Sequence, residues 1–312
     1  MRGEGEAAEI LRVRKTLDAR DQIEQIARCA LDAWWFTQQL HEKWWEHCAS
    51  TIKLSMIVLE ALCEHYEMPD DKMIALCKRE VVPSPLTAAA VRIATRERDA
   101  SIAAAMSPAR WPHGANVADF WTSTDWPMQL FDALGPLGVP PARRASLFCA
   151  VLRPVLARVP GSNDSAHQAL AAAEAGCSAT RAYELALRVM IDAHSTCTAI
   201  ERGELPLPSI AEERRPLAIG AMWTILSACA VTVLERVGLE VPTTIAPMVV
   251  VASIALDPRA PVERPTESAE MDRVHSATIA AQIRAALPCD ELVAYADAKR
   301  GGPLEPSSDD VR

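Results

Sequence analysis

The long N-terminal stretch without proline or glycine is the feature that most constrains the fold of this chain. No proline precedes Pro69, and no glycine occurs between residues 6 and 68. Because these two residue types interrupt helices most strongly, their absence favours helix over the whole stretch. Apolar side chains also recur there at helical spacing, at Ile23, Ile26, Ala27, Ala30, Leu31 and Trp34. The sequence therefore predicts helices over residues 6–66, with breaks at N-cap residues such as Asp18.

The rest of the chain repeats this helical pattern between proline-containing turns. Ser84 followed by Pro85 is typical of a helix start, and Gly203 is typical of the residue after a helix end. No alternating strand pattern of useful length is present in the sequence. The apolar periodicity predicts helices at about residues 127–135, 141–158, 164–175, 178–202, 268–286 and 289–299. We therefore predict an all-α fold, a large multi-helix bundle-like array.

Two apolar segments lie close together in the C-terminal half. Residues 216–234 and residues 241–256 contain no charged side chain. The first segment just reaches the length that spans a bilayer, and the second is short for it. We favour two central helices that are hydrophobic all round because they are buried. A membrane hairpin formed by residues 216–256 is the alternative.

Charge and cysteine content limit the partners and the compartment. The chain has 32 Lys and Arg against 41 Asp and Glu, a net charge of −9. Proteins that bind nucleic acid through its phosphates need a surplus of cations, so we do not expect binding through a global basic surface. None of the 9 cysteines forms a CxxC pair. Reduced thiols, together with a charged N-terminus that lacks an apolar core, predict a cytoplasmic protein.

The densest group of residue types that bind metal ions lies at 41–48 and consists of His41, Glu42, Glu46, His47 and Cys48. The HExxH spacing of zinc proteases and the ExxH spacing of ferritin-like proteins are both missing from it. Asp70–Asp71 resembles the start of the aspartate-rich motif of class I terpene synthases, all-α enzymes whose carboxylates hold Mg²⁺. Here the fifth position is Ile74, which is not an acid. We predict no metal site and no cofactor.

Two resemblances converge on one segment. Arg188 and His194 match the Rx4–6H pattern and so resemble HEPN ribonucleases, helical enzymes in which the two side chains act together at a phosphodiester. That pattern also arises by chance, so a half-buried pair on an amphipathic helix is the alternative, and no catalytic residue is assigned. Residues 190–195 (MIDAHS) resemble a stretch of phlebovirus nucleoproteins, which are all-helical. This second resemblance implies a helical assembly protein, but those proteins are basic, and no RNA-binding residue is carried over.

The tryptophans are the most distinctive residues. The chain has 8 Trp against 4 Phe and 3 Tyr. Trp34 and Trp45 share one helix face, because their separation is close to a whole number of turns. Tryptophan is enriched where protein partners bind, and a loop tryptophan must dock on its own chain or meet a partner. We therefore predict five interaction residues, with core packing as the alternative: Trp34, Trp45, Trp111, Trp121 and Trp126.

The domain organisation follows from these segments. We expect an N-terminal long-helix region at 1–106, a Trp-rich connecting loop at 107–127, a C-terminal helical domain at 128–300 and a flexible tail at 301–312. No intact catalytic motif is present, which favours a non-catalytic assembly protein. Such a coat, nucleocapsid-type or scaffold subunit would bind itself or another protein. The alternatives are a membrane-associated helical protein and an all-α enzyme, HEPN-like or metal-dependent, with a site built from residues distant in sequence.

Overall fold

The computed structural model is helical throughout its regular parts. It describes residues 15–26, 57–59, 61–68, 117–125, 127–161, 163–207, 214–239, 245–260 and 269–300. No strand occurs in these ranges, so the predicted all-α class is confirmed. Residues 15–26, 57–59 and 61–65 are helical, as the N-terminal pattern predicts. The later helices are α5 (Val117–Ser123), α6 (Pro127–Leu134), α7 (Pro141–Leu156), α8 (Asp164–Ala175), α9 (Ala179–Glu201), α10 (Arg215–Glu235), α11 (Ile245–Ala255), α12 (Ala269–Ala286) and α13 (Cys289–Arg300).

Local sequence signals account for several of these boundaries. The backbone N–H of Arg181 donates to the Ser178 hydroxyl at 3.3 Å, so Ser178 caps α9. Gly203 follows the end of the same helix at a φ of 71°, a value that glycine adopts without strain. Pro141 occupies the first position of α7, where its missing N–H has no cost. The predicted helix ends therefore agree with the observed ones to within a few residues.

Helix α10 is the centre of the fold. It packs against α7, α8, α9 and α11. Its segment Leu217–Glu235 is long and apolar enough to cross a membrane, yet 89% of that segment is buried inside the protein. Burial by neighbouring helices is thus sufficient to explain why this segment is hydrophobic on all sides.

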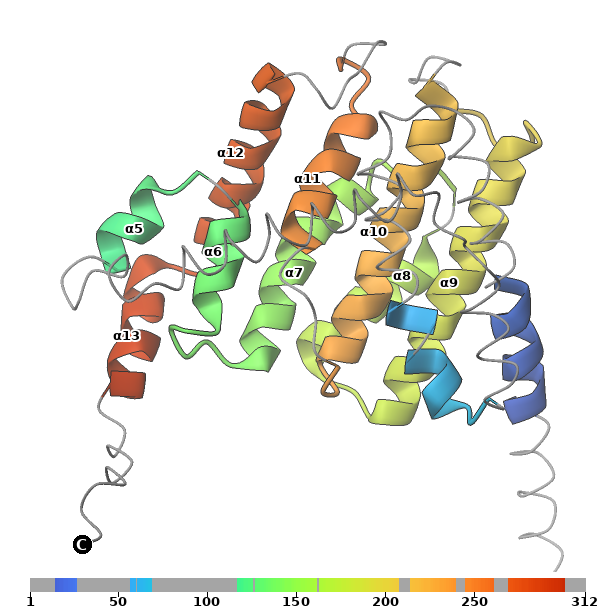
Figure 1. The fold of residues 1–312 in the computed structure, drawn as a ribbon, viewed down its shortest axis with the longest axis horizontal. Helices are drawn as coiled ribbons and strands as arrows, with labels where there is room; N and C mark the ends of the chain where they lie inside the picture. The colour runs from blue at the N-terminus through green and yellow to red at the C-terminus, as the bar shows by residue number, and fades with distance from the viewer. Residues whose placement is uncertain are drawn as a thin grey trace, which may run out of the picture.

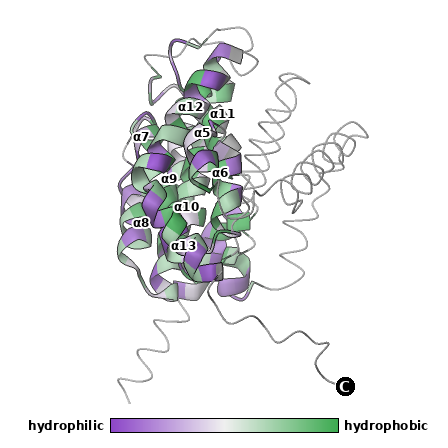
Figure 2. Cartoon of the chain, turned by 90° about the vertical axis from the view of Figure 1, so that its left-hand side faces the viewer, coloured by the Kyte–Doolittle hydropathy of each residue, from purple (hydrophilic) through white to green (hydrophobic). Residues whose placement is uncertain are grey.

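The helices form an elongated array around this centre. Figure 1 shows α5 and α13 at one end, α11 and α10 in the middle, and α9 at the other end. In the view turned by 90°, hydrophilic and hydrophobic stretches alternate along single helices (Figure 2), as expected for helices that bury one face. One continuous hydrophobic core runs through the described helices, from Trp121 in α5 to Ile200 in α9.

The predicted connecting loop at 107–127 is partly wrong, because residues 117–123 form helix α5. A helix of two turns between proline-containing segments gives too little periodicity to stand out. Trp121 lies in this helix, is 1% exposed, and donates its indole N–H to the carbonyl of Leu287 at 3.1 Å. Trp121 thus docks on its own chain. The other predicted interaction residues, Trp34, Trp45, Trp111 and Trp126, lie outside the described residues.

Cations from distant segments bind the carbonyl groups that helices leave free at their C-terminal ends. Arg284 donates to the carbonyl of Thr124 beyond α5 at 2.7 Å, and Arg143 donates to that of Ala286 in α12 at 2.7 Å. Lys299 reaches the carbonyl of Pro136, beyond α6, at 3.0 Å. These contacts satisfy orphan carbonyls and place positive charge at the negative ends of helix dipoles. They fix how the outer helices are arranged.

Candidate functional site

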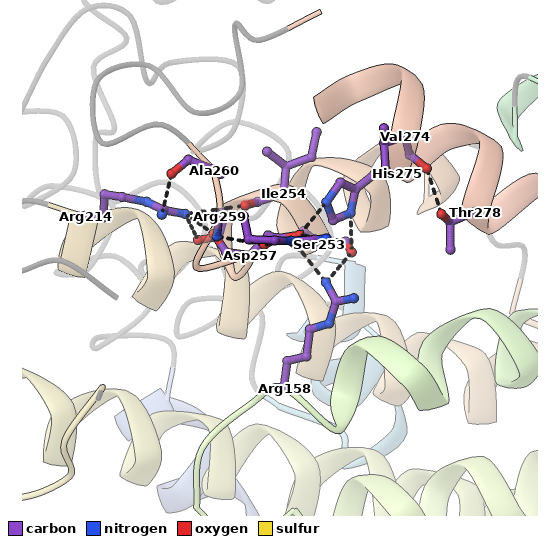
Figure 3. A network of polar contacts seen from close by, with 11 residues as sticks. Arg158, Arg214, Ser253, Ile254, Asp257, Arg259, Ala260, Val274, His275 and Thr278 are labelled. Atoms are coloured by element: carbon purple, nitrogen blue, oxygen red, sulfur yellow. Dashed lines mark hydrogen bonds and ion pairs between the residues drawn. The ribbon is translucent and has the colours of Figure 1, made fainter. Parts of the chain in front are cut away.

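A buried polar network surrounds the C-terminal end of α11 (Figure 3). Ser253 comes from α11, Asp257 follows that helix, and His275 comes from α12. These three residues are 3%, 2% and 4% exposed, in the order given. Polar groups this deep must find partners inside the protein, because water cannot reach them. The network is therefore the first place among the described residues to look for chemistry.

The three side chains form a hydrogen-bonded series. The Ser253 Oγ lies 2.8 Å from His275 Nδ1, and His275 Nε2 lies 3.1 Å from Asp257 Oδ2. Burial lowers the pKa of His275, although the carboxylate of Asp257 opposes that shift. The imidazole is therefore neutral near pH 7. A carboxylate can only accept, so the single ring proton lies on Nε2, and Nδ1 accepts from the serine hydroxyl.

Asp257 is held as a carboxylate. It accepts from the backbone N–H of Arg259 at 2.8 Å and from the guanidinium Nε and Nη2 of that residue at 3.0 and 2.7 Å. These bonds, with that from His275, hold the pKa of Asp257 well below its usual range despite its burial. The negative charge is thus permanent at physiological pH.

Arg158 completes the environment of the serine. Its Nη1 lies 3.2 Å from Ser253 Oγ, and it also approaches the carbonyl of the same residue at 3.4 Å. The hydroxyl therefore accepts from the guanidinium of Arg158 while it donates to His275. Because Arg158 follows the end of α7, this contact joins α7 to α11 and α12.

Arg214 supports the turn that carries Asp257. This guanidinium is 2% exposed and donates to the carbonyls of Ala255, Asp257 and Ala260 at 2.7, 3.0 and 3.0 Å. Burial lowers its pKa, and the nearby Asp257 charge opposes that effect. Arg214 immediately precedes α10, so it ties the start of the central helix to the end of α11. A cation at this position also compensates the negative end of the α11 dipole.

The network has the three residue types of a Ser–His–Asp hydrolase site in the same order, but the two ring nitrogens of the histidine are exchanged and the serine is not accessible. In such a site the serine oxygen must reach a substrate carbonyl. Here the Ser253 oxygen is enclosed, and Arg158 already donates to it. As described, the arrangement fixes the packing of α7, α10, α11 and α12 rather than presenting a nucleophile.

The residues singled out by sequence motifs are not brought together. Arg188 is exposed on α9, whereas His194 is half-buried and its Nδ1 lies 3.3 Å from the Thr198 hydroxyl. Six positions along a helix turn two side chains about 120° apart, so they point in different directions. The groups at 41–48 and at Asp70–Asp71 lie outside the described residues. Among the described residues, no three His, Cys, Asp or Glu side chains gather in a way that could hold a metal ion.

Sequence reasoning missed the network itself. The one usable signal was Asp257, which directly follows the uncharged segment at 241–256 and precedes Pro258, as helix-ending residues do. Nothing in the local pattern linked it to His275 or to Arg158. Comparisons of this chain with protein families, with curated proteins and with solved structures give no match.

Proposed function

We propose that this protein is a non-catalytic helical subunit that assembles with copies of itself, as a coat, nucleocapsid-type or scaffold protein does. The observation that carries the proposal is the enclosure of the polar network at the C-terminal end of α11. Ser253, Asp257 and His275 bond to one another and to arginines of the same chain, inside the helical array. Because these titratable side chains bond to other groups of the same chain, they support a structural role rather than a catalytic one.

The way the cations are used supports the same proposal. Arg143, Arg214 and Arg284 donate to carbonyl groups of their own chain. Such guanidinium groups have less capacity left for phosphates, which agrees with the net charge of −9. The segment at 190–195 that resembles phlebovirus nucleoproteins lies within α9, where Met190 and Ala193 are buried in the core. That placement supports a structural role for the segment.

The test is the mass of the full-length protein in solution. We expect multi-angle light scattering to give a mass of more than one chain, and electron microscopy to show closed rings or filaments. Trp111→Ala and Trp126→Ala are expected to weaken association, since tryptophans often dominate interfaces. Trp121→Phe is the matched control and is expected to leave association intact, because Trp121 is buried in its own chain. A monomer at every concentration would contradict the proposal.

An enzyme with a site assembled from distant residues is the second candidate, favoured by the Ser253–His275–Asp257 series. Its test is labelling of the folded protein by a fluorophosphonate probe, which reacts with activated serines. We expect no labelling, because Ser253 is 3% exposed. Labelling that disappears in Ser253→Ala, and persists in the control Ser195→Ala on the exposed side of α9, would favour the enzyme instead.

A further inference from the structure

An ion pair with a buried carboxylate lies at the opposite end of α10 from Arg214. Glu235 is the last residue of α10, and its side chain is 5% exposed. Its Oε1 lies 3.7 Å from the Nε of Arg144, which comes from the first turns of α7 and is 33% exposed. The distance is too long for a hydrogen bond but close enough for a direct ionic attraction.

This pair leaves hydrogen-bonding capacity unused on both sides. The buried Oε2 of Glu235 and the buried Nε of Arg144 have no hydrogen-bond partner among the described residues. A buried carboxylate normally accepts several hydrogen bonds, as Asp257 does in the network at the other end of the bundle. Glu235 also stands at the negative end of the α10 dipole, where a second negative charge is unfavourable. The charged form is therefore poorly supported by its surroundings.

The other arginines of α7 near Glu235 already pair with different carboxylates. Arg143 binds Glu291, and Arg153 binds Glu174, each at 2.7 Å or less. Burial is the main cause that raises the pKa of the Cys149 thiol, also on α7, and the charge of Glu235 adds a small contribution in the same direction. Within the described part of the chain, α8, α9 and α11 contribute no charged group that shifts the pKa of Glu235.

Arg236 follows Glu235 in the chain but does not share its site. Its guanidinium packs beside Gly176 at the end of α8, with Nη2 3.1 Å from the position a β-carbon would occupy there. Among the described residues, Arg144 is thus the cation that acts on the ionisation of Glu235. Burial raises the pKa of Glu235 to about 7, and Arg144 opposes that shift.

We propose that the Glu235–Arg144 pair is a proton-controlled contact between the C-terminal end of α10 and the N-terminal end of α7. When Glu235 is ionised, its charge holds the Arg144 guanidinium against the end of α10. When Glu235 takes up a proton, the attraction ends, and Arg144 turns toward solvent without the cost of an unpaired buried anion. Protonation raises the net charge of the pair by one unit, and the released guanidinium presents that charge to solvent.

The experiment follows the Nε–H resonance of Arg144 in full-length protein that carries ¹⁵N only in arginine side chains. The resonance is identified by its loss in Arg144→Lys. We expect its chemical shift to change with a midpoint near pH 7 in the wild type and to be independent of pH in Glu235→Gln, which mimics the protonated side chain. The matched control is Glu174→Gln, which removes the partner of another α7 arginine and should leave the Arg144 titration unchanged.

Two results would overturn the proposal. One is a wild-type resonance that does not shift between about pH 5 and about pH 9, a range that spans the expected Glu235 midpoint on both sides. The other is the same titration in wild type and in Glu235→Gln. Circular dichroism establishes that each variant is folded. If Glu235→Gln fails to fold, ¹³C labelling of the glutamate carboxyl groups in the wild type provides the midpoint directly, and a Glu235 midpoint near 4.5 also contradicts the proposal.

Discussion

Replacing Arg214 with methionine is expected to lower the free energy of unfolding by about 3 kcal/mol, because the buried carbonyl groups of Ala255, Asp257 and Ala260 lose their charged donor. Methionine retains the apolar stem and fills similar space, so the change isolates the guanidinium. The carbonyls of Ala255 and Ala260 receive bonds of 2.7 and 3.0 Å from it. Removing the guanidinium also removes the free-energy cost of burying its charge. The expected loss of stability is therefore smaller than the sum of the contributions of the individual hydrogen bonds.

Chemical denaturation followed by circular dichroism measures this effect. Arg188→Met is the matched control, since Arg188 is exposed on α9, and it should change stability by less than about 0.5 kcal/mol. Arg214→Lys keeps the charge but cannot span several carbonyls, so we expect a smaller loss than with methionine. If Arg214→Met is as stable as wild type, the connection between α10 and α11 does not depend on this side chain.

Replacing Asp257 with alanine is expected to cost about 3 kcal/mol at pH 7, since it leaves the buried Nε2–H of His275 without an acceptor. The backbone N–H of Arg259 loses its acceptor in the same change. Asp257 is one of the few ionised groups in the described interior, and its charge is fully paired. The loss should therefore exceed that of an exposed acid such as Glu270, which serves as the control in Glu270→Ala.

The pH dependence gives this prediction a second readout. The pKa of Asp257 is lowered in the folded state from its ordinary value of 3.8. A group with a lowered folded pKa contributes stability above its unfolded pKa and loses it as the pH falls toward the folded value. The difference in stability between wild type and Asp257→Ala should thus be constant above about pH 5 and narrow below about pH 4. A difference that does not change with pH would show that the carboxylate charge is not what stabilises the turn.

The sequence predicts the helices well because each helix is encoded by its own residues. The spacing of apolar side chains and the capping residues Ser178 and Gly203 act over a few positions. The central position of α10 is also predicted by the sequence, because a helix that is apolar on every face is buried on every face. The prediction fails at α5, where a helix of only 7 residues carries too little pattern.

The candidate site could not be predicted in the same way. Ser253 and His275 are 22 positions apart, and Arg158 lies 95 positions from Ser253. No local period links residues at such separations. Their contact depends on how α7, α11 and α12 pack, and one helical turn of difference would separate them. The same reason explains why Trp121, predicted to meet a partner, instead bonds to a carbonyl 166 positions away.

The sequence by itself thus determined the all-α class, most helix boundaries and the apolar central helix, because these follow from short-range periodicity and from the cost of exposing apolar surface. Only the tertiary structure decided which polar side chains meet. It joined Asp257 to His275 within the core and placed the Arg144 guanidinium 3.7 Å from the Glu235 carboxylate. Buried polar groups take their properties from the neighbours that packing supplies, and those neighbours come from remote parts of the chain.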